Sequence, residues 1–594
     1  MKQHRGTKVM AILAMAIPIT MLAGCATAPG DAGNSEGKAG GTLIVAGNAD
    51  VLYMDPASSY SSQDSQLHRL MTRSLFADVL DKDSDVGASK IVPDLALEIP
   101  TVDNGGISED GLTYTIKIQE GVNFDAPDGP REIIADDVVR AVKRICNPVS
   151  PSVALSYYTA TITGLQEYCD GFTEVAADIE AIRDYVESND IAGVQATNNN
   201  TVTFTLTQPA TDFISILALS VFMAPQPVEY LDYLPDSPEL RQNMIASGPY
   251  RMTEYIPNEK ITLERNPNWD AEKDNVREAY VDAIEISMGQ EAAAVQQQLE
   301  AGTVDMQWAD TVVPTASVPA LLATNDERLV IGGAGGIKPY IVINTLSPNA
   351  GGAFADTEVR RALNFGVNRA AIQQTLGGPG LAEIAKQILP TEVLGDEPTN
   401  VLEVPDEGDQ AKAKQILKDA GYSSAVPVRI LYRETEPYAS IAAILQQDLE
   451  AAGFAVDLRV TTQNAFYGEF LLNEDVTRAG EWDIALAAWG ADYLDGRAYL
   501  VPMLDGRNYE GGSANFGAWN NDEFNEKIDS ALAATDPAVA KASWKAADEI
   551  ATMDAAWVPV AFTRTPIFSS ERVGNFYFLG STKNGDMANV WLKK

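Results

Sequence analysis

The sequence predicts a mixed α/β protein built from more than one lobe. Segments that alternate apolar and polar residues, the spacing of strands, are interleaved with segments of helical spacing along most of the chain. The chain of 594 residues is also too long for a single hydrophobic core, so it must divide into two or three parts.

The predicted elements follow in order from an opening strand at residues 41–47, which has glycine at both ends. A helix is predicted at residues 64–80, because apolar residues from Leu67 to Leu80 recur at helical spacing. Further strands are predicted at 113–118, 202–206, 261–263, 283–288, 329–331, 340–344, 428–432, 455–461 and 483–489. Further helices are predicted at 136–146, 292–301, 358–367, 409–420, 439–452 and 522–533.

Residues 1–24 are predicted to be a lipoprotein signal peptide. Basic residues precede an apolar run at 9–23 that is shorter than a bilayer-crossing helix. The Leu-Ala-Gly-Cys that ends at Cys25 resembles the lipobox of bacterial lipoproteins, in which Cys25 would be lipidated. Residues 25–40 are rich in glycine and small residues, and we interpret them as a flexible tether. The alternative is an ordinary secretory signal with an incidental cysteine.

The strong negative charge excludes one class of partner. The chain has 83 Asp and Glu residues and 43 Lys and Arg residues. Removal of residues 1–24, which hold three of the cations and no acid, would leave a net charge of −43. We expect no nucleic acid partner, because its phosphates would be repelled. Anionic lipid would be repelled too, so the lipid on Cys25 would anchor the chain at the outer face of the bacterial cell membrane.

Histidine and cysteine usage bears on catalysis and metal binding. The chain has two histidines, His4 and His68, so neither an imidazole-built metal site nor a histidine-dependent catalytic unit is expected. We therefore predict no enzyme activity, no catalytic residue, no metal and no cofactor. After Cys25 two cysteines remain, Cys146 and Cys169, and a leftover pair in an oxidising compartment is expected to form a disulfide.

Four stretches, ordered along the chain, form recognisable motifs. They are residues 110–124 with 135–139, Ser-Gly-Pro-Tyr at 247–250 with 261–269, residues 340–344 with 359–365 and Asn-Arg at 368–369, and Trp-Asp at 482–483 with Trp-Gly-Ala-Asp-Tyr at 489–493. Together they resemble the extracytoplasmic solute-binding proteins of family 5, which serve peptide and oligopeptide importers of the ABC type. Asn368 departs from the aspartate common at its position, and we interpret this departure as structural.

The resemblance implies a two-lobed α/β fold, like that of periplasmic binding proteins, with an additional inserted domain. The ligand cleft would lie between the first and third of these three domains. Lobe I is expected at 41–80, 203–329 and 555–594, the inserted domain II at 81–202, and lobe III at 330–554. The glycine-rich residues 332–336 are interpreted as a flexible crossing between lobes.

The resemblance also implies which residues bind the ligand. In the family, the aspartate of the fourth motif pairs with the amino terminus of the peptide, which assigns this role to Asp492. Residues just before it bond the peptide backbone, which assigns ladder contacts to Ala488 through Gly490. Trp489 and Tyr493 are candidates for lining the pocket.

Two further contacts with the ligand are expected. The loop at 47–55, just after the opening strand, would supply the contact from the first lobe. Arg497 is the nearest candidate cation for the carboxyl terminus of a peptide.

These expectations describe a monomeric, membrane-anchored binding protein that captures a peptide by lobe closure and delivers it to ABC permease subunits. Two alternatives stay open. The same scaffold could bind another solute, such as an oligosaccharide, an opine-like compound or a metal chelate, or it could act as a receptor for peptide signals.

Overall fold

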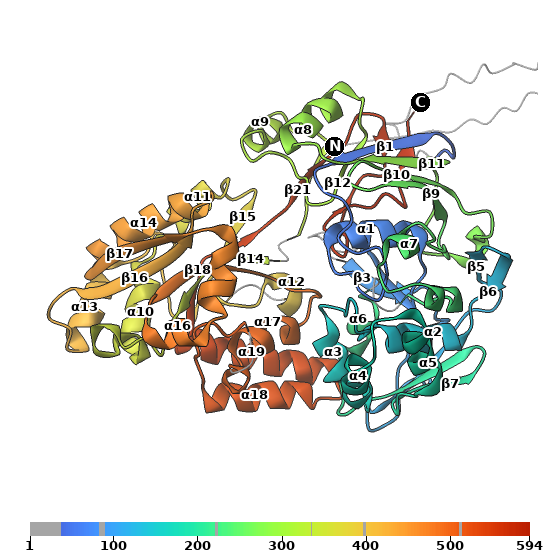
Figure 1. Ribbon diagram of the computed structural model, residues 1–594. Coiled ribbons are helices and arrows are strands. Elements are labelled where there is room, and N and C mark those ends of the chain that lie inside the picture. The colour runs from blue at the N-terminus through green and yellow to red at the C-terminus, as the bar shows by residue number, and fades with distance from the viewer. Residues whose placement is uncertain are drawn as a thin grey trace, which may run out of the picture.

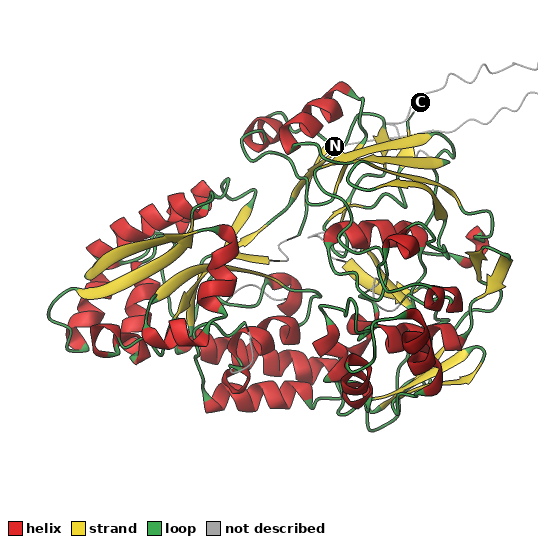
Figure 2. Ribbon diagram, in the orientation of Figure 1, coloured by secondary structure: helices red, strands yellow, loops and turns green. Residues whose placement is uncertain are grey.

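The computed structural model describes residues 37–81, 89–219, 224–333, 336–395, 399–509 and 514–593. The predicted signal peptide, Cys25 and most of the predicted tether lie outside these residues. The described chain combines two large sheets with a helix-rich part, and the predicted mixed α/β class is confirmed (Figure 1, Figure 2). Within the described ranges, no helix combines the length and apolar composition that crossing a bilayer requires.

The first sheet has five strands, and we call the part built on it the five-stranded lobe. The strand order is β12-β1-β11-β10-β9, with β1 parallel to both of its neighbours. The bounds are β1 Thr42–Gly47, β9 Tyr250–Ile256, β10 Lys260–Arg265, β11 Ala283–Ser287 and β12 Met306–Trp308, with helices α8 Ala292–Ala301 and α9 Val318–Ala323. The end of the chain returns to this lobe, since Val573, Met587 and Val590 are buried in its core.

The helix-rich part, drawn in teal in Figure 1, packs below the first sheet. Its small sheet has the order β4-β8-β7. The bounds are β2 Phe76–Leu80, β3 Ser89–Pro93, β4 Thr113–Lys117, β5 Asn123–Ala126, β6 Gly129–Glu132, β7 Val194–Asn198, β8 Thr201–Thr205, α2 Ala135–Arg144, α3 Leu155–Thr159, α4 Leu165–Thr173, α5 Ile179–Ser188, α6 Phe213–Leu217 and α7 Pro238–Arg241. Leu206, Phe213 and Leu231 lie in the same core. The chain just after residue 203, which was expected in lobe I, therefore packs in the helix-rich part before it reaches the five-stranded lobe.

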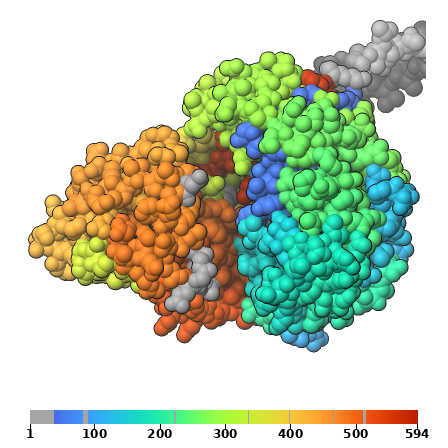
Figure 3. Space-filling model, viewed as in Figure 1, coloured from blue at the N-terminus to red at the C-terminus, as the bar shows by residue number. Residues whose placement is uncertain are grey.

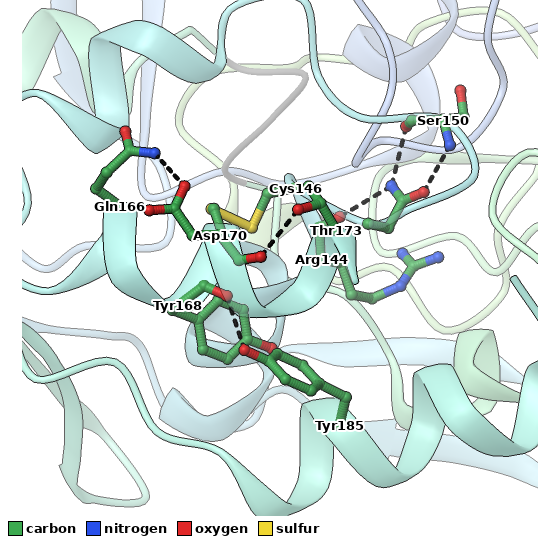
Figure 4. Close-up of a disulfide and its surroundings, with 10 residues drawn as sticks. Arg144, Cys146, Ser150, Gln166, Tyr168, Asp170, Thr173 and Tyr185 are labelled. Carbon is green, nitrogen blue, oxygen red and sulfur yellow. Dashed lines mark hydrogen bonds between the residues drawn. A yellow bond between two sulfur atoms is a disulfide. The ribbon is translucent and has the colours of Figure 1, made fainter. Parts of the chain in front are cut away.

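A disulfide joins two helical segments of this part. Cys146 follows α2 and Cys169 lies in α4, and their Cα atoms are 5.4 Å apart. Figure 4 shows the bond beside Tyr168 and Tyr185, and the Tyr185 hydroxyl donates to the Tyr168 carbonyl oxygen at 2.8 Å. Both sulfur-bearing residues are buried, so the bond lies within the core of the helix-rich part.

The third part is a seven-stranded sheet with helices on both faces, which we call the seven-stranded lobe. The order is β15-β20-β14-β18-β16-β17, and β19 pairs with β14. The strands are β14 Gly336–Ile343, β15 Ala382–Ile384, β16 Val426–Arg433, β17 Phe454–Thr461, β18 Ile484–Gly490, β19 Trp557–Pro559 and β20 Ala561–Thr563. The helices include α10 Thr357–Gly366, α11 Arg369–Thr375, α12 Thr391–Leu394, α13 Gln410–Asp419, α14 Tyr438–Ala451, α16 Glu474–Ala479, α17 Gly496–Leu504, α18 Asp522–Leu532 and α19 Pro537–Met553.

Alternating residues of β14 and β18 supply the two cores of this lobe. Ile341 and Ile484 pack on the face covered by α10 and α14, whereas Val342 and Ala485 pack on the opposite face. Because β19 and β20 pair with β14 and β15, residues 557–563 belong to this sheet, and the return to the five-stranded lobe begins after Thr563 rather than at residue 555.

Most predicted elements are present with ends shifted by a few residues, but the helix at 64–80 is wrong. Helix α1 (Ser62–Met71) ends early, and residues 76–80 form β2. The Thr72 hydroxyl donates to the His68 carbonyl oxygen at 2.9 Å, and the Ser74 amide donates to the Asp94 carboxylate at 3.0 Å. Asp94 is fully buried and also pairs with Arg73 and Arg277, so a long-range ion cluster stops the helix where local periodicity would continue it.

Two adjacent chain segments connect the five-stranded lobe with the seven-stranded lobe. On one side of the crossing β13 (Leu329–Ile331) pairs with β21 (Pro566–Phe568), with Ile331 opposite Pro566. On the other side Gly336 lies opposite Thr563, within the pairing of β14 and β20. The predicted crossing at 332–336 therefore lies beside a second crossing at 564–565; residues 334–335 lie outside the described residues.

His68 provides a test of the packing around α1. Its side chain is 1% exposed, and burial lowers its pKa to about 4, with the nearby Asp55 carboxylate partly offsetting this effect. Because the unfolded pKa is about 6.5, neutral His68 stabilises the fold above that pH, and this contribution is lost as the pH falls toward 4. His68 is the single histidine after residue 24, so NMR of its ring should show no titration between pH 8 and pH 5. A titration midpoint of the His68 ring near that measured in the urea-unfolded chain would contradict the burial of this side chain.

Candidate functional site

A cavity of about 450 Å³ lies between the seven-stranded lobe and the rest of the molecule. Figure 3 shows the recess between the surface drawn in orange and the surfaces drawn in blue and green. Its volume is in the range of small-ligand sites, roughly 300–1,000 Å³. The lining includes Tyr60, Ser62 and Ser65, Asp78, Lys90, Ser215 and Leu219, Gly333, Gly336 and Lys338, Glu392, Gly490 through Leu494, Thr563 and Thr565, Phe578, Gly580, Ser581 and Lys583.

Asp492 lies in this lining and is bonded to two tyrosines from other parts of the chain. The Tyr60 hydroxyl donates to Asp492 Oδ1 at 2.7 Å, and the Tyr157 hydroxyl donates to Oδ2 at 2.8 Å. Burial, reinforced by the Asp492 charge, raises the pKa of both phenols above the ordinary value, so both stay protonated and donate. A carboxylate can accept about four hydrogen bonds, so these two leave acceptor capacity on Asp492.

The position of Tyr60 is set by the start of α1. The Asp64 carboxylate accepts the backbone N–H groups of Leu52, Tyr53, Tyr60 and Ser61 at 2.9–3.2 Å. Ser61 caps the helix and accepts the Asp64 amide in return. Asp64 therefore fixes the backbone of the loop that presents Tyr60 to the cavity.

The residues after Asp492 dock the seven-stranded lobe onto the helix-rich part. The Tyr493 hydroxyl donates to Asp212 Oδ2 at 2.7 Å, and Arg497 pairs with Asp212 Oδ1 at 3.3 Å. Arg497 Nη2 also donates to Thr161 Oγ1 at 3.0 Å. Tyr493 lines the cavity, but its polar end is directed to Asp212. Arg497, the candidate cation for the carboxyl terminus of a peptide, is buried in this ion pair and is not in the cavity lining.

The residues of β18 predicted to contact the ligand differ in their surroundings. Gly490 lines the cavity, and no atom would lie within 4 Å of a Cβ added there. The Ala488 amide donates to the Tyr467 hydroxyl at 3.2 Å, and neither Ala488 nor Trp489 is in the lining. The Trp489 indole donates to the Ala498 carbonyl oxygen at 3.0 Å, which holds the ring against α17.

The loop at 47–55 is the predicted contact from the first lobe. None of its residues lines the cavity, and Asp55 is buried in an ion pair with Arg144 at 2.6 Å. Tyr60, Ser62 and Ser65 are the residues of this region that line the cavity.

Sequence reasoning missed two tyrosines and two lysines of the site. Tyr60 and Tyr157 belong to no motif, and only the fold brings them to Asp492. Lys338 and Lys583 also belong to the lining, and burial followed by the Lys583 charge lowers the pKa of Lys338. A signal for Lys338 was available, since it is a charged residue at the start of an otherwise apolar strand.

The acidic side chains do not gather into a metal site. In the ranges the structure describes, no group of three or more His, Cys, Asp or Glu residues could hold a metal ion. The polar groups of the cavity are suited to hydrogen bonding and charge pairing with an organic ligand.

The sequence matches one protein family over most of its length. Residues 90–511 match the family described as bacterial extracellular solute-binding proteins, family 5 Middle. This range includes β14, β18 and Asp492, and therefore much of the cavity.

Individual relatives cover most of the chain at low identity. The probable deoxycholate-binding periplasmic protein YgiS of Escherichia coli (strain K12) is 26% identical, covering 79% of this chain and 81% of the relative. The di/tripeptide-binding protein 2 of Pseudomonas aeruginosa (strain UCBPP-PA14) is 26% identical, covering 80% of this chain and 82% of the relative. The solved structure of clavulanic acid biosynthesis oligopeptide binding protein 2 is 25% identical, with a TM-score of 0.79, covering 94% of this chain and 96% of that one.

Arg497 is expected to stabilise the fold rather than bind ligand. Arg497→Met should lower the free energy of unfolding by about 3–5 kcal/mol, because it leaves the buried Asp212 carboxylate without its cation. The matched control is Arg459→Met, whose partner Asp457 is half-exposed and whose loss should cost about 0.5 kcal/mol or less. Urea denaturation of both variants measures the difference. Equal effects of the two substitutions on the free energy of unfolding would show that the ion pair between Arg497 and Asp212 does not stabilise the contact between the seven-stranded lobe and the helix-rich part.

Proposed function

Because the chain belongs to the bacterial extracellular solute-binding proteins of family 5, which serve transporters and are not enzymes, we propose that it captures a peptide in the cavity at Asp492 and delivers it to an ABC permease. The peptide would bind with its ammonium group at Asp492. Relatives named for di- and tripeptides and for oligopeptides support this ligand class.

The observation that carries the proposal is the environment of Asp492. Its carboxylate faces a cavity, and its two tyrosine partners are neutral hydroxyl donors that leave its charge uncompensated. A primary ammonium supplies three donors and a positive charge, which fits the remaining acceptor capacity. A ligand without a cationic group would leave this partly buried charge unpaired.

The connection between the lobes supports capture by closure. Gly333, Gly336, Thr563 and Thr565 belong to the crossing segments and also line the cavity. A ligand in the cavity would therefore touch both lobes and the segments whose dihedral angles change as the lobes move. Ligand binding would favour the closed form by its extra contacts there, and the permease would accept that form.

The predicted lipid anchor at Cys25 completes the proposal. The described chain begins at residue 37, beside β1 of the five-stranded lobe (Figure 1). The predicted tether at residues 25–40 would span roughly 20 Å, which would keep the binding protein close to a permease in the same membrane.

Asp492→Asn tests the ammonium site. The substitution keeps the size of the side chain but removes its charge, so the affinity for a free-amine peptide should fall by about 30-fold or more. Native mass spectrometry should first identify the peptides that copurify with the wild-type protein, and calorimetry should then measure one of them. N-acetylation of the peptide should weaken binding to the wild type by a similar factor and cause little further loss in the variant.

The matched control is Asp457→Asn, because Asp457 is an exposed carboxylate on β17, outside the cavity. It should bind peptide as the wild type does. Copurification of a sugar, a bile acid or a metal chelate, or equal peptide binding by Asp492→Asn, would replace the peptide proposal with the alternative of another solute on the same scaffold.

Cys25→Ser tests the lipid anchor in cells. The full-length protein should fractionate with membranes, and mass spectrometry should find its mature N-terminus at a diacylated Cys25. The Cys25→Ser protein should lack the acyl groups and lose this anchorage. An unmodified N-terminus elsewhere in the wild type would instead indicate an ordinary secretory signal.

A further inference from the structure

Strand β18 has one edge that no other described strand covers beyond Ala485. On one side β18 pairs with β14 as far as Gly490. On the other side its pairing with β16 ends at Ala485, which lies opposite Leu431. The stretch from Leu486 to Gly490 therefore has an open edge, and it leads directly to Asp492. An open edge of this kind is where an extended peptide adds to a sheet through main-chain hydrogen bonds.

Two side chains occupy the first part of this open edge. Arg433 Nη2 donates to the Leu486 carbonyl oxygen at 3.2 Å. The Tyr467 hydroxyl accepts from the Ala488 amide at 3.2 Å and donates to the Ala488 carbonyl oxygen at 3.4 Å. Alternate residues of a strand direct their N–H and C=O groups to the same edge, so the next residue to do so is Gly490. Because Gly490 lines the cavity and Ala488 does not, the edge is capped at Ala488 and open to the cavity at Gly490.

Three neighbours hold the Tyr467 ring at the edge of β18. Its ring centre lies 4.9 Å from that of Phe466, 5.8 Å from that of Phe516 and 5.5 Å from the guanidinium carbon of Arg433. Tyr467 belongs to a π-helical turn at Phe466–Leu471, a rare conformation that is frequent at functional sites. The hydroxyl is therefore a built part of this edge.

The position of Asp492 sets the register of a peptide on this edge. With its ammonium at Asp492, beyond the C-terminal end of β18, the peptide would run antiparallel to the strand and towards Ala488. In an antiparallel pair, every second residue exchanges both N–H and C=O bonds with the residue opposite. A first residue opposite Gly490 therefore places the third residue opposite Ala488. The Tyr467 hydroxyl already donates and accepts there, as the backbone of that third residue would.

We propose that Tyr467 limits the length of peptide that pairs with β18 by taking the ladder position of the third residue. The inference rests on the proposed function and deepens it. Ala488, which the sequence analysis assigned to the peptide ladder, is then already occupied by a side chain. The first residue of the peptide pairs with Gly490, and a third residue gains no main-chain bond from the strand. The substrate class is a dipeptide, to which further residues add no affinity.

The wild-type protein tests this length limit without any substitution. Calorimetry measures Ala-Ala, Ala-Ala-Ala, and Ala-Ala-Ala with a methyl group on the amide nitrogen of its third residue. The tripeptide should bind at most about twofold more tightly than the dipeptide, and N-methylation should weaken it by about twofold or less, because Ala488 makes no bond to it. Tripeptide binding that is about tenfold tighter, or a tenfold loss on N-methylation, would overturn the proposal.

Tyr467→Ala frees the N–H and C=O groups of Ala488 for the third residue of a peptide. The affinity for the tripeptide relative to the dipeptide should then rise by about tenfold over the wild-type ratio, the size expected for two main-chain hydrogen bonds. N-methylation of the third residue should remove this gain, which distinguishes a new ladder contact from extra space. An unchanged ratio in Tyr467→Ala would overturn the proposal.

Tyr438→Ala is the matched control. The Tyr438 ring also lies against Arg433, with the guanidinium carbon 3.5 Å from its centre, but within the described chain no hydrogen bond joins it to β18. This variant should keep the wild-type ratio of tripeptide to dipeptide affinity. Melting temperatures check that both variants are folded.

The outcomes separate the length limit from the proposed function. A wild-type protein that binds its copurified longer peptides but neither Ala-Ala nor Ala-Ala-Ala would overturn the length limit and leave peptide capture at Asp492 intact. A wild-type protein that binds no peptide at all would overturn the proposed function and the length limit with it.

Discussion

The paired crossing between the two large sheets is the constraint on which the site depends. Ile331 lies opposite Pro566 on one side, and Gly336 lies opposite Thr563 on the other, so the lobes are joined by a ribbon two strands wide. Residues of this ribbon are also part of the cavity lining. Part of the cavity wall therefore belongs to the same structure that sets the relative orientation of the lobes.

The cavity combines its charges with neutral hydroxyl groups. Asp492 is bonded to two tyrosine hydroxyls, which satisfy part of its hydrogen-bonding capacity without cancelling its charge. Lys338 and Lys583 supply positive charge in a protein whose overall charge is strongly negative. The net charge of the chain is thus a poor guide to the charge that a ligand meets in the cavity.

The sequence predicted the elements of the two lobes well where periodicity was sustained, as in β14, β16, β17, β18 and α14. It failed where a distant residue decides the local structure: the buried Asp94 cluster ends α1, and no local pattern reveals that cluster. It also placed the return of the chain too early, since strands as short as β19 and β20 carry little periodic signal.

The residues of the candidate site also fall into two groups: those that the sequence predicts and those that only the fold brings together. Asp492 could be named because its motif is contiguous in the sequence, whereas Tyr60 and Tyr157 reach it only through the fold. Arg497 was assigned by its distance along the chain, but α17 directs it to Asp212, which lies in the helix-rich part. For Arg497, proximity to Asp492 in the sequence therefore did not predict proximity to the cavity.

The buried contact of Tyr493 and Arg497 with Asp212 has a kinematic consequence. It fixes the seven-stranded lobe to the helix-rich part at one place, and the crossing ribbon fixes the lobe to the five-stranded sheet at another. Any motion that separates the seven-stranded lobe from the helix-rich part must therefore break the contacts with Asp212 as well as bend the ribbon. Because Asp212 is buried, breaking them would leave its carboxylate without its cation, which resists separation at this end of the lobe.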